Sequence, residues 1–523
     1  MENYGILDRV KIPKRIQAGF LSGVAAGLLT HFYMFTHKLP NWDDINNFVG
    51  YGAGRNVGRW FLHFTLKWGS EWSLPAVHGV LAVFLLAIAA CLISENLGFK
   101  RKSSVCLISI AVVTFPSVAG TMTFMFVVHT YALAVVMMCL GTYLIHKYRY
   151  GFLPGSILLI VAMGIYQPYI SFAISLMLGG MLSDILRRAK EGKKIFLDGI
   201  KNVIILLVSV AVYMLLCRLY YPGISEETYG GVGQMGQIAI AEVPRLIGRC
   251  YKRFLEYFIW KPFTYVSPVM RFANIIVCIC IGILFIYNLY CIKRNKDKIA
   301  FFLGIMTAGL LPLAMAFVYF MAPEAPFSIL MTYAYVLVYA VAVLLLEIAA
   351  DNWQGRGTDK KVVRLFRKAA VAIVFFSVLL ESYTSYLVTN EAYYRMSVAY
   401  ERTAAFFNRI LVRLEQEEGF AYGDKIVILG EFYYVDNPSP IEINDLENDR
   451  FREMSGIALE NGMITSGVRD NFIRMYLGFE LPSVSEAEKE EIMQSLQYKE
   501  MSCYPDVGAI QKINGIWVIK LCD

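Results

Sequence analysis

The sequence predicts a polytopic α-helical membrane protein with a small external α/β domain at its carboxyl end. Of the 523 residues, 57% are hydrophobic and only 17% are charged, and the mean hydropathy is +0.50. Soluble domains carry roughly 25% charged residues. The apolar residues gather in runs that approach the about 20 residues needed to cross a bilayer. The net charge of +7 comes from short basic loops, as membrane topology requires, so it does not indicate nucleic-acid binding.

Eleven apolar runs predict about eleven transmembrane segments. No signal-peptide cleavage site follows the polar amino terminus, so the first run is expected to be a retained span. In chain order the runs are 17–35, 74–93, 105–118, 124–145, 152–164, 169–186, 203–219, 272–291, 299–320, 328–350 and 369–389.

The fifth and sixth runs are short and are separated at Gly164-Ile165-Tyr166-Gln167-Pro168. Proline lacks a backbone donor and disfavours helix at the residue before it, so a helix break is expected there. One long bent helix is the alternative. The distribution of charge favours two segments, because only then do the basic loops fall on one side of the membrane.

That distribution also predicts the topology. The loops on one side carry 25 Lys and Arg, against nine in the opposite loops 37–73 and 220–268. The amino terminus is therefore predicted to be cytoplasmic and the carboxyl terminus external. The external parts are the loops 37–73 and 220–268 and the tail 391–523, and the transmembrane module is 1–390.

The tail has the pattern of a soluble α/β domain. A polar helix is expected at 391–418 and a strand at 425–429. The segments 507–513 and 516–521 flank Asn514-Gly515, which is a hairpin signal. No disulfide is expected between the two cysteines of the tail, Cys503 and Cys522.

The first external loop concentrates polar residues just behind the first span. Asp43 and Asp44 are adjacent, Trp42 precedes them, and Arg55 and Arg59 follow in a glycine-rich stretch. Ionisable groups held at a membrane surface are costly to desolvate, which makes them functional candidates. The alternative is a solvated loop whose aspartates cap the next helix.

A second polar element follows the seventh span. From position 242 onward apolar residues recur at helical spacing, and Arg245, Arg249 and Arg253 occupy much of the remaining surface. Such a helix can lie in the interface with its apolar side in lipid and its basic side toward phosphate. Simple anchoring in anionic headgroups is the alternative.

These groups suit the transfer of a sugar from a lipid phosphate to a hydroxyl. Asp43 or Asp44 would take the hydroxyl proton, which contributes about 10²–10⁴-fold to the rate. A polyprenyl phosphate is already a good leaving group and needs cationic groups rather than a general acid. Arg55, Arg59 and the basic helix supply these, so no metal or other cofactor is expected.

The acidic pair with Gly54-Arg55, the Tyr166-Gln167 element and the external tail resemble a known family. They are similar to the bacterial serotype-converting O-antigen glucosyltransferases of the GT-C superfamily. The resemblance covers about residues 15 to 390 in topology, but only these short motifs in detail. It implies a polyprenyl-phosphate-linked glucose donor, a glycan or cell-wall polymer acceptor outside, and Asp43 and Asp44 as the catalytic pair. It also implies a location in the bacterial cytoplasmic (inner) membrane.

Further candidates are less specific. Tyr166 and Gln167 could hydrogen-bond a sugar, or Gln167 could satisfy carbonyls freed by Pro168. Glu324 could line the acceptor path or belong to a solvated turn, and Trp42 could stack on a sugar. The six histidines show no metal-ligand spacing.

Two rival functions differ in what they do to the substrate. A flippase or exporter of lipid-linked glycans would move its substrate without forming a glycosidic bond. A GT-C enzyme with a protein acceptor would differ only in the acceptor. The transferase interpretation also implies two pathway partners, a polyprenyl-phosphate glucosyltransferase and a small flippase.

Overall fold

The computed structural model describes residues 12–50, 57–220, 239–260, 263, 265–293, 297–323, 329–354, 361–431, 454, 459–460, 463–464 and 466–521. The chain forms two compact units. The first contains Met1–Lys38 and Gly50–Glu391, and the second contains Leu39–Val49 and Ala392–Asp523.

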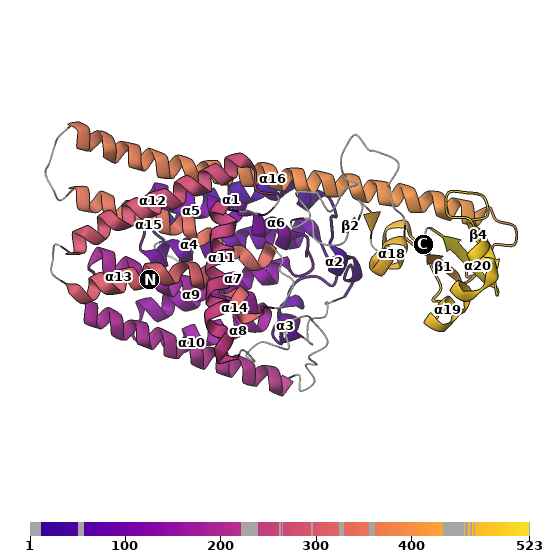
Figure 1. The fold of residues 1–523 in the computed structure, drawn as a ribbon, viewed down its shortest axis with the longest axis horizontal. Coiled ribbons are helices and arrows are strands. Elements are labelled where there is room, and N and C mark those ends of the chain that lie inside the picture. Colours follow the sequence, from indigo (N-terminus) through magenta and orange to yellow (C-terminus); the bar gives the residue numbers. More distant parts are fainter. Residues whose placement is uncertain are drawn as a thin grey trace, which may run out of the picture. The chain divides into compact units, whose positions relative to one another are not determined.

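The first unit is a bundle of helices (Figure 1). In chain order they are α1 (Lys14–Thr36), α3 (Leu62–Leu66), η3 (Pro75–Gly79), α4 (Val80–Leu97), α5 (Lys102–Thr114), α6 (Pro116–Met122), α7 (Val128–Lys147), α8 (Phe152–Ile165), η4 (Gln167–Tyr169), α9 (Ile170–Arg187), α10 (Gly192–Tyr220), η5 (Ile240–Glu242), α11 (Val243–Leu255), η6 (Glu256–Trp260), α12 (Pro268–Lys293), α13 (Lys298–Met315), α14 (Val318–Met321), η7 (Ile329–Val336) and α15 (Leu337–Gln354). The boundary between the units falls within α16 (Lys361–Glu415).

Eight helical segments of the described chain are long and apolar enough to cross a membrane, and the bent pair α5 and α6 raises the number to nine. The eight coincide with eight of the predicted spans. Of the other three, 105–118 falls on the bent pair, 152–164 is the shorter α8, and 369–389 lies within α16. The predicted helical class is confirmed, whereas the membrane location and the total of eleven crossings stay predictions.

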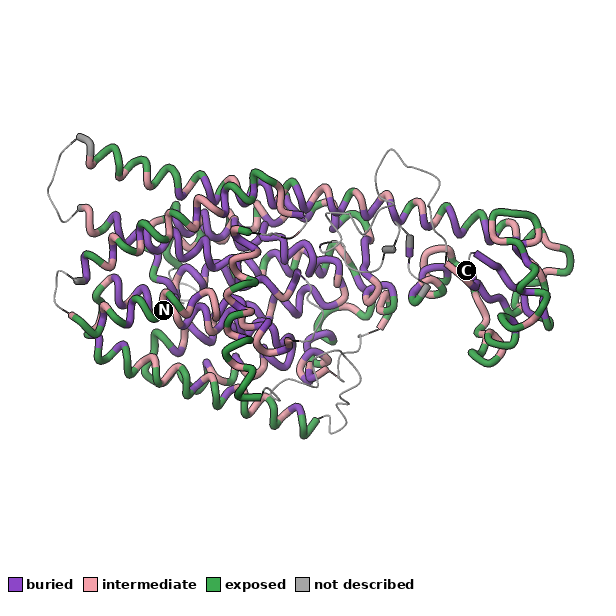
Figure 2. The backbone as a smooth tube through the Cα atoms, viewed as in Figure 1, coloured by how far each residue is buried: buried purple, intermediate pink, exposed green. Residues whose placement is uncertain are grey.

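Burial separates the inner from the outer helices of this bundle. The segment that contains α15 is 94% buried, whereas the window in α10 is 22% buried, a contrast visible in Figure 2. Helices that are apolar all round and still exposed are typical of surfaces that face lipid.

Prolines set two breaks in the bundle. Pro116 begins α6 after a 43° bend from α5, within the apolar run 105–118 that the sequence predicted as a single segment. Proline suits the first turn of a helix because its missing N–H is not needed there. The predicted break at Pro168 is confirmed: α8 ends at Ile165, and Tyr166 is extended, with φ −153° and ψ 103°.

Glycines let α1 approach its neighbours closely. Gly19, Gly23 and Gly27 are spaced four residues apart and are buried against α4 and α5. A Cβ at Gly27 would lie 2.6 Å from Cγ1 of Val83, closer than real Cβ contacts. Small residues at helix interfaces are the usual way to pack helices in a membrane, where burial from water supplies little force.

We expect Gly27→Leu to lower the free energy of unfolding by about 1–3 kcal/mol, because the added carbons overpack the α1–α4 contact. Thermal unfolding in detergent micelles measures this change. Gly282→Leu on α12 is the control, since no atom lies within 4 Å of a Cβ built there. Equal unfolding temperatures for both variants would contradict the packing argument.

Basic and acidic groups join several helix ends at one end of the bundle. Glu347 on α15 accepts hydrogen bonds from the backbone N–H groups of Lys100 and Arg101, at 3.1 Å each. Asp351, one turn later, pairs with Arg101 at 3.2 Å and Arg187 at 3.3 Å. Loops that the charge pattern assigned to the cytoplasm therefore meet at a common end, which we name the basic end.

The second unit has a three-stranded sheet in the order β1 (Ile426–Leu429), β5 (Ile516–Lys520), β4 (Ile510–Ile513). β5 pairs parallel with β1 and antiparallel with β4. The predicted hairpin is confirmed, with Asn514 and Gly515 both at positive φ, as such two-residue turns require. The sheet packs on α19 (Glu486–Gln494) and α20 (Leu496–Glu500).

The remaining elements of the second unit are α2 (Trp42–Asn46), β2 (Leu459–Glu460), β3 (Met463–Ile464), α18 (Ser466–Phe472) and η8 (Ile473–Leu477). The predicted polar helix at 391–418 is not a separate element, because α16 is continuous from the apolar run 369–389 to Glu415. Cys503 is a free cysteine, and Cys522 lies outside the described residues.

Candidate functional site

The acidic pair lies on the short helix α2 of the second unit. Asn41 caps this helix, since its Oδ1 accepts a hydrogen bond from the N–H of Asp44 at 3.0 Å. The Asp44 side chain is fully buried, with 0% exposure, whereas Asp43 is partly exposed. The cap is thus Asn41, and neither aspartate has the capping role considered as the alternative.

Tyrosines of the second unit surround Asp44. The rings of Tyr400, on α16, and Tyr476 are nearly parallel, with centroids 6.1 Å apart, and Phe48 lies 5.2 Å from Tyr476. The hydroxyl of Tyr400 donates to the carbonyl of Pro40, just before α2. Burial raises the pKa of Tyr400, and the charges of Tyr476 and Asp44 raise it further. The Asp44 carboxylate is therefore close enough to influence this tyrosine.

Arg59 lies in the first unit on a platform of tyrosines. Its Nη1 donates to the hydroxyl of Tyr131 at 3.0 Å, and its Cζ is 5.1 Å from the ring centre of Tyr166. Tyr131, in the first turn of α7, stacks on Tyr166 at 4.4 Å, and Tyr169 meets Tyr166 edge-on at 4.8 Å. Cation–π contacts of this kind attract a guanidinium to the ring faces. We name Arg59, Tyr131, Tyr166 and Tyr169 the Arg59 cluster.

Gln167 anchors the segment that presents this arginine. Its Nε2 donates to the carbonyl of Val57, so this donor serves the loop and not a carbonyl freed by Pro168. The hydroxyl of Tyr213, on α10, donates to the carbonyl of Gly58 at 3.1 Å. A Cβ at Gly58, where φ is +75°, would lie 2.7 Å from that hydroxyl. Gln167, at the helix break, and Tyr213, on α10, thus hold the loop through the backbone carbonyls of Val57 and Gly58.

Gln167→Leu is expected to lower the free energy of unfolding by about 1–3 kcal/mol, because it leaves the partly buried carbonyl of Val57 without this donor. Thermal unfolding in micelles is the measurement. Gln17→Leu removes a comparable amide-to-carbonyl bond, of 3.0 Å, at an exposed site, and should cost less than about 0.5 kcal/mol. If Gln17→Leu lowers the free energy of unfolding more than Gln167→Leu does, Gln167 does not anchor the loop.

The basic helix predicted after position 242 is α11, and one part of its interpretation is wrong. Its apolar residues Leu246 and Cys250 are buried inside the protein, where α11 packs on α13 and α14, and do not face lipid. Arg245 is exposed, Arg249 is partly buried, and Arg253 pairs with Glu256 at 3.0 Å. The helix therefore docks by its apolar side on the bundle and keeps basic groups at its surface.

The structure brings only some of the predicted site residues together. Arg59, Tyr166 and Gln167 converge, whereas Asp43 and Asp44 belong to the other unit. Trp42 begins α2 and is partly buried. Arg55 and Glu324 lie outside the described residues.

Two parts of the site were missed by the sequence analysis. Tyr131 and Tyr400 are scattered among the 33 tyrosines of an aromatic-rich chain, so no local pattern marks them.

Within the described residues, no group of three or more His, Cys, Asp and Glu side chains could hold a metal ion.

The family comparison covers most of these elements. The model of the family described as glucosyl transferase GtrII matches residues 32–346, which is more than half of the chain. The match begins within α1 and ends within α15, so it includes α2, the Arg59 cluster and α11. No curated protein matches the chain. The chain belongs to the GtrII family of glucosyl transferases, in agreement with its resemblance to the serotype-converting enzymes.

Proposed function

We propose that this glucosyltransferase takes glucose from a polyprenyl phosphate and transfers it to a glycan or cell-wall polymer outside the cytoplasm. The family indicates the transferred sugar. The observation that supports a lipid-linked donor is the set of eight long apolar helical segments in the described part of the chain. A polyprenyl chain dissolves in the bilayer that such helices cross. An enzyme built mainly inside a membrane is suited to a lipid-linked substrate.

The proposed base is one of the acidic pair, and we assign it to Asp43. A general base must reach the hydroxyl proton that it removes. Asp43 keeps part of its surface exposed, whereas Asp44 is fully buried. In one inverting displacement the acceptor oxygen forms its bond to the anomeric carbon, the bond to the phosphate oxygen breaks, and the acceptor proton passes to Asp43. Asp44 then keeps the helix in place.

The proposed partner of the leaving phosphate is Arg59, with Arg245, Arg249 and Arg253 as a second group and Arg55 proposed from sequence alone. A planar guanidinium binds phosphate oxygens through two parallel N–H bonds. Charge that develops on the phosphate as the glycosidic bond breaks is stabilised by a cation held ready for it. The tyrosines of the Arg59 cluster supply such a fixed position.

The donor proposal is tested with purified protein in vesicles. Polyprenyl-phosphate glucose is offered in one reaction and a nucleotide-linked glucose in the other, each with a glycan acceptor. We expect a new glycosidic bond only with the lipid donor. Equal or preferential use of the nucleotide sugar would overturn the proposal, and lipid-donor movement without bond formation would favour a flippase.

A further inference from the structure

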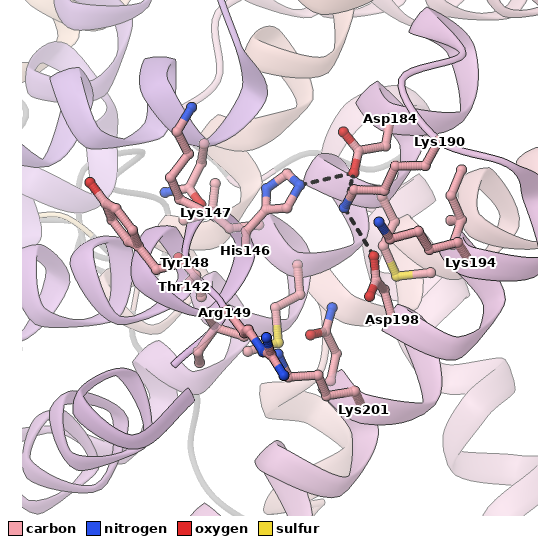
Figure 3. Close-up of a pocket in the computed structure, with 17 residues that line it drawn as sticks. Thr142, His146, Lys147, Tyr148, Arg149, Asp184, Lys190, Lys194, Asp198 and Lys201 are labelled. Carbon is pink, nitrogen blue, oxygen red and sulfur yellow. Dashed lines mark hydrogen bonds and ion pairs between the residues drawn. The ribbon is translucent and has the colours of Figure 1, made fainter. Parts of the chain in front are cut away.

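A pocket of about 390 Å³ lies at the basic end of the first unit. It is formed where the ends of α7 and α9 meet the beginning of α10 (Figure 3). Tyr131 and His146 are both on α7, 15 residues apart, which corresponds to about 22 Å along a helix. The pocket is therefore separate from the Arg59 cluster.

The two carboxylates of the pocket are already engaged with their neighbours. Lys190 lies between Asp184, at 2.8 Å, and Asp198, at 2.9 Å, and His146 Nε2 lies 3.1 Å from Asp184 (Figure 3). Burial by itself would lower the pKa of Lys190, but the two carboxylates raise it above its usual value. Lys190 is therefore a fixed ammonium whose charge is used within the protein.

Four further cationic residues line the same pocket: Lys147, Arg149, Lys194 and Lys201. None of these four has a carboxylate within ion-pair distance among the described residues. With His146 neutral, the pocket has five cationic side chains against two carboxylates, a net charge of +3. Such an excess, held in a concave site, attracts an anion.

The other walls of the pocket are apolar. Leu176, Met177, Met181 and Ile195 contribute to the lining. Nearby, Tyr150 is 71% exposed and Phe152 is 42% exposed, and aromatic side chains of this kind mark the membrane interface. A site with basic and apolar walls at this level fits a lipid headgroup better than a free ion.

We propose that this pocket binds the phosphate group of an anionic phospholipid from the leaflet at the basic end. Lys194, Lys201 and Arg149 would contact the phosphate oxygens, and the apolar wall would take the first carbons of the acyl chains. Basic pockets between membrane helices are suited to such headgroups. The inference does not depend on the proposed sugar donor.

The test uses the whole protein, delipidated in detergent, with its unfolding temperature followed as lipid is added. The probes are phosphatidylglycerol, zwitterionic phosphatidylcholine and inorganic phosphate. A ligand that binds only the folded state raises the unfolding temperature with concentration. We expect phosphatidylglycerol to do so, and phosphatidylcholine and inorganic phosphate to have much weaker effects.

The variants assign the effect to the pocket. Lys194→Gln with Lys201→Gln should weaken binding of phosphatidylglycerol at least about tenfold. The control, Lys193→Gln with Lys102→Gln, removes the same charge from exposed residues outside the pocket and should bind as the wild type does. If the first variant unfolds early without lipid, Arg149→Gln replaces it.

Two results would overturn the proposal. If the pocket and control variants bind phosphatidylglycerol equally weakly, net charge alone attracts the lipid. Equal stabilisation by inorganic phosphate and phosphatidylglycerol would mean that the pocket binds a free anion.

Discussion

Asp43→Asn is expected to lower kcat for glucosyl transfer by about 10²–10⁴-fold, the usual contribution of a positioned general base. Asparagine keeps the size and shape of the side chain but cannot accept the acceptor proton. The helix should survive, because its cap is Asn41. The measurement is the initial rate with polyprenyl-phosphate glucose at saturating donor and acceptor, together with the unfolding temperature.

Two further substitutions distinguish a catalytic role of Asp43 from a structural one. Asp44→Asn alters a fully buried carboxylate, so we expect a change in unfolding temperature and a smaller change in kcat. Asp43→Glu keeps the proton acceptor and should retain part of the activity. Full activity in Asp43→Asn, with folding unchanged, would remove this residue as the base.

Arg59→Gln is expected to lower kcat/KM by about 10²–10³-fold, as for the loss of one group that stabilises developing negative charge. The reason is that glutamine cannot neutralise the phosphate as the glycosidic bond breaks. The kcat/KM of Arg59→Lys should lie between those of the wild type and Arg59→Gln, because lysine restores the charge but not the planar pair of donors. The same transfer assay, with donor concentration varied, provides the measurement.

Arg218→Gln is the matched control for this second prediction. Arg218 is an exposed arginine in the last turn of α10, so its loss changes the net charge equally without touching the Arg59 cluster. We expect its kcat/KM to equal that of the wild type. An Arg59→Gln protein that folds normally and transfers glucose at the wild-type rate would show that Arg59 does not stabilise the leaving phosphate.

Periodicity and charge predicted most of the elements in this chain. Apolar runs long enough for a bilayer appear as helices, because in lipid every backbone polar group must bond within its own segment. Pro168 gave the break between α8 and α9, and Asn514-Gly515 gave the β4–β5 hairpin. These features depend on local chemistry, which the sequence contains directly.

The features that were missed depend on contacts between distant residues. A single glycine pattern does not reveal that a Cβ at Gly27 would meet Val83. The place of α2 in the second unit depends on α18, more than 400 residues later. The tyrosine platform under Arg59 joins α7 to the break before α9, and its members have no common spacing.

The make-up of the second unit has a consequence for how the enzyme is synthesised. Leu39–Val49 leaves the ribosome early, yet the residues of Ala392–Asp523 with which it packs are translated more than 340 residues later. Domains of a nascent chain generally fold from the amino terminus onward, but here an early peptide must wait for a segment that is translated much later. A chain whose translation stops before the tail would therefore lack Tyr400 and Tyr476, which surround Asp44.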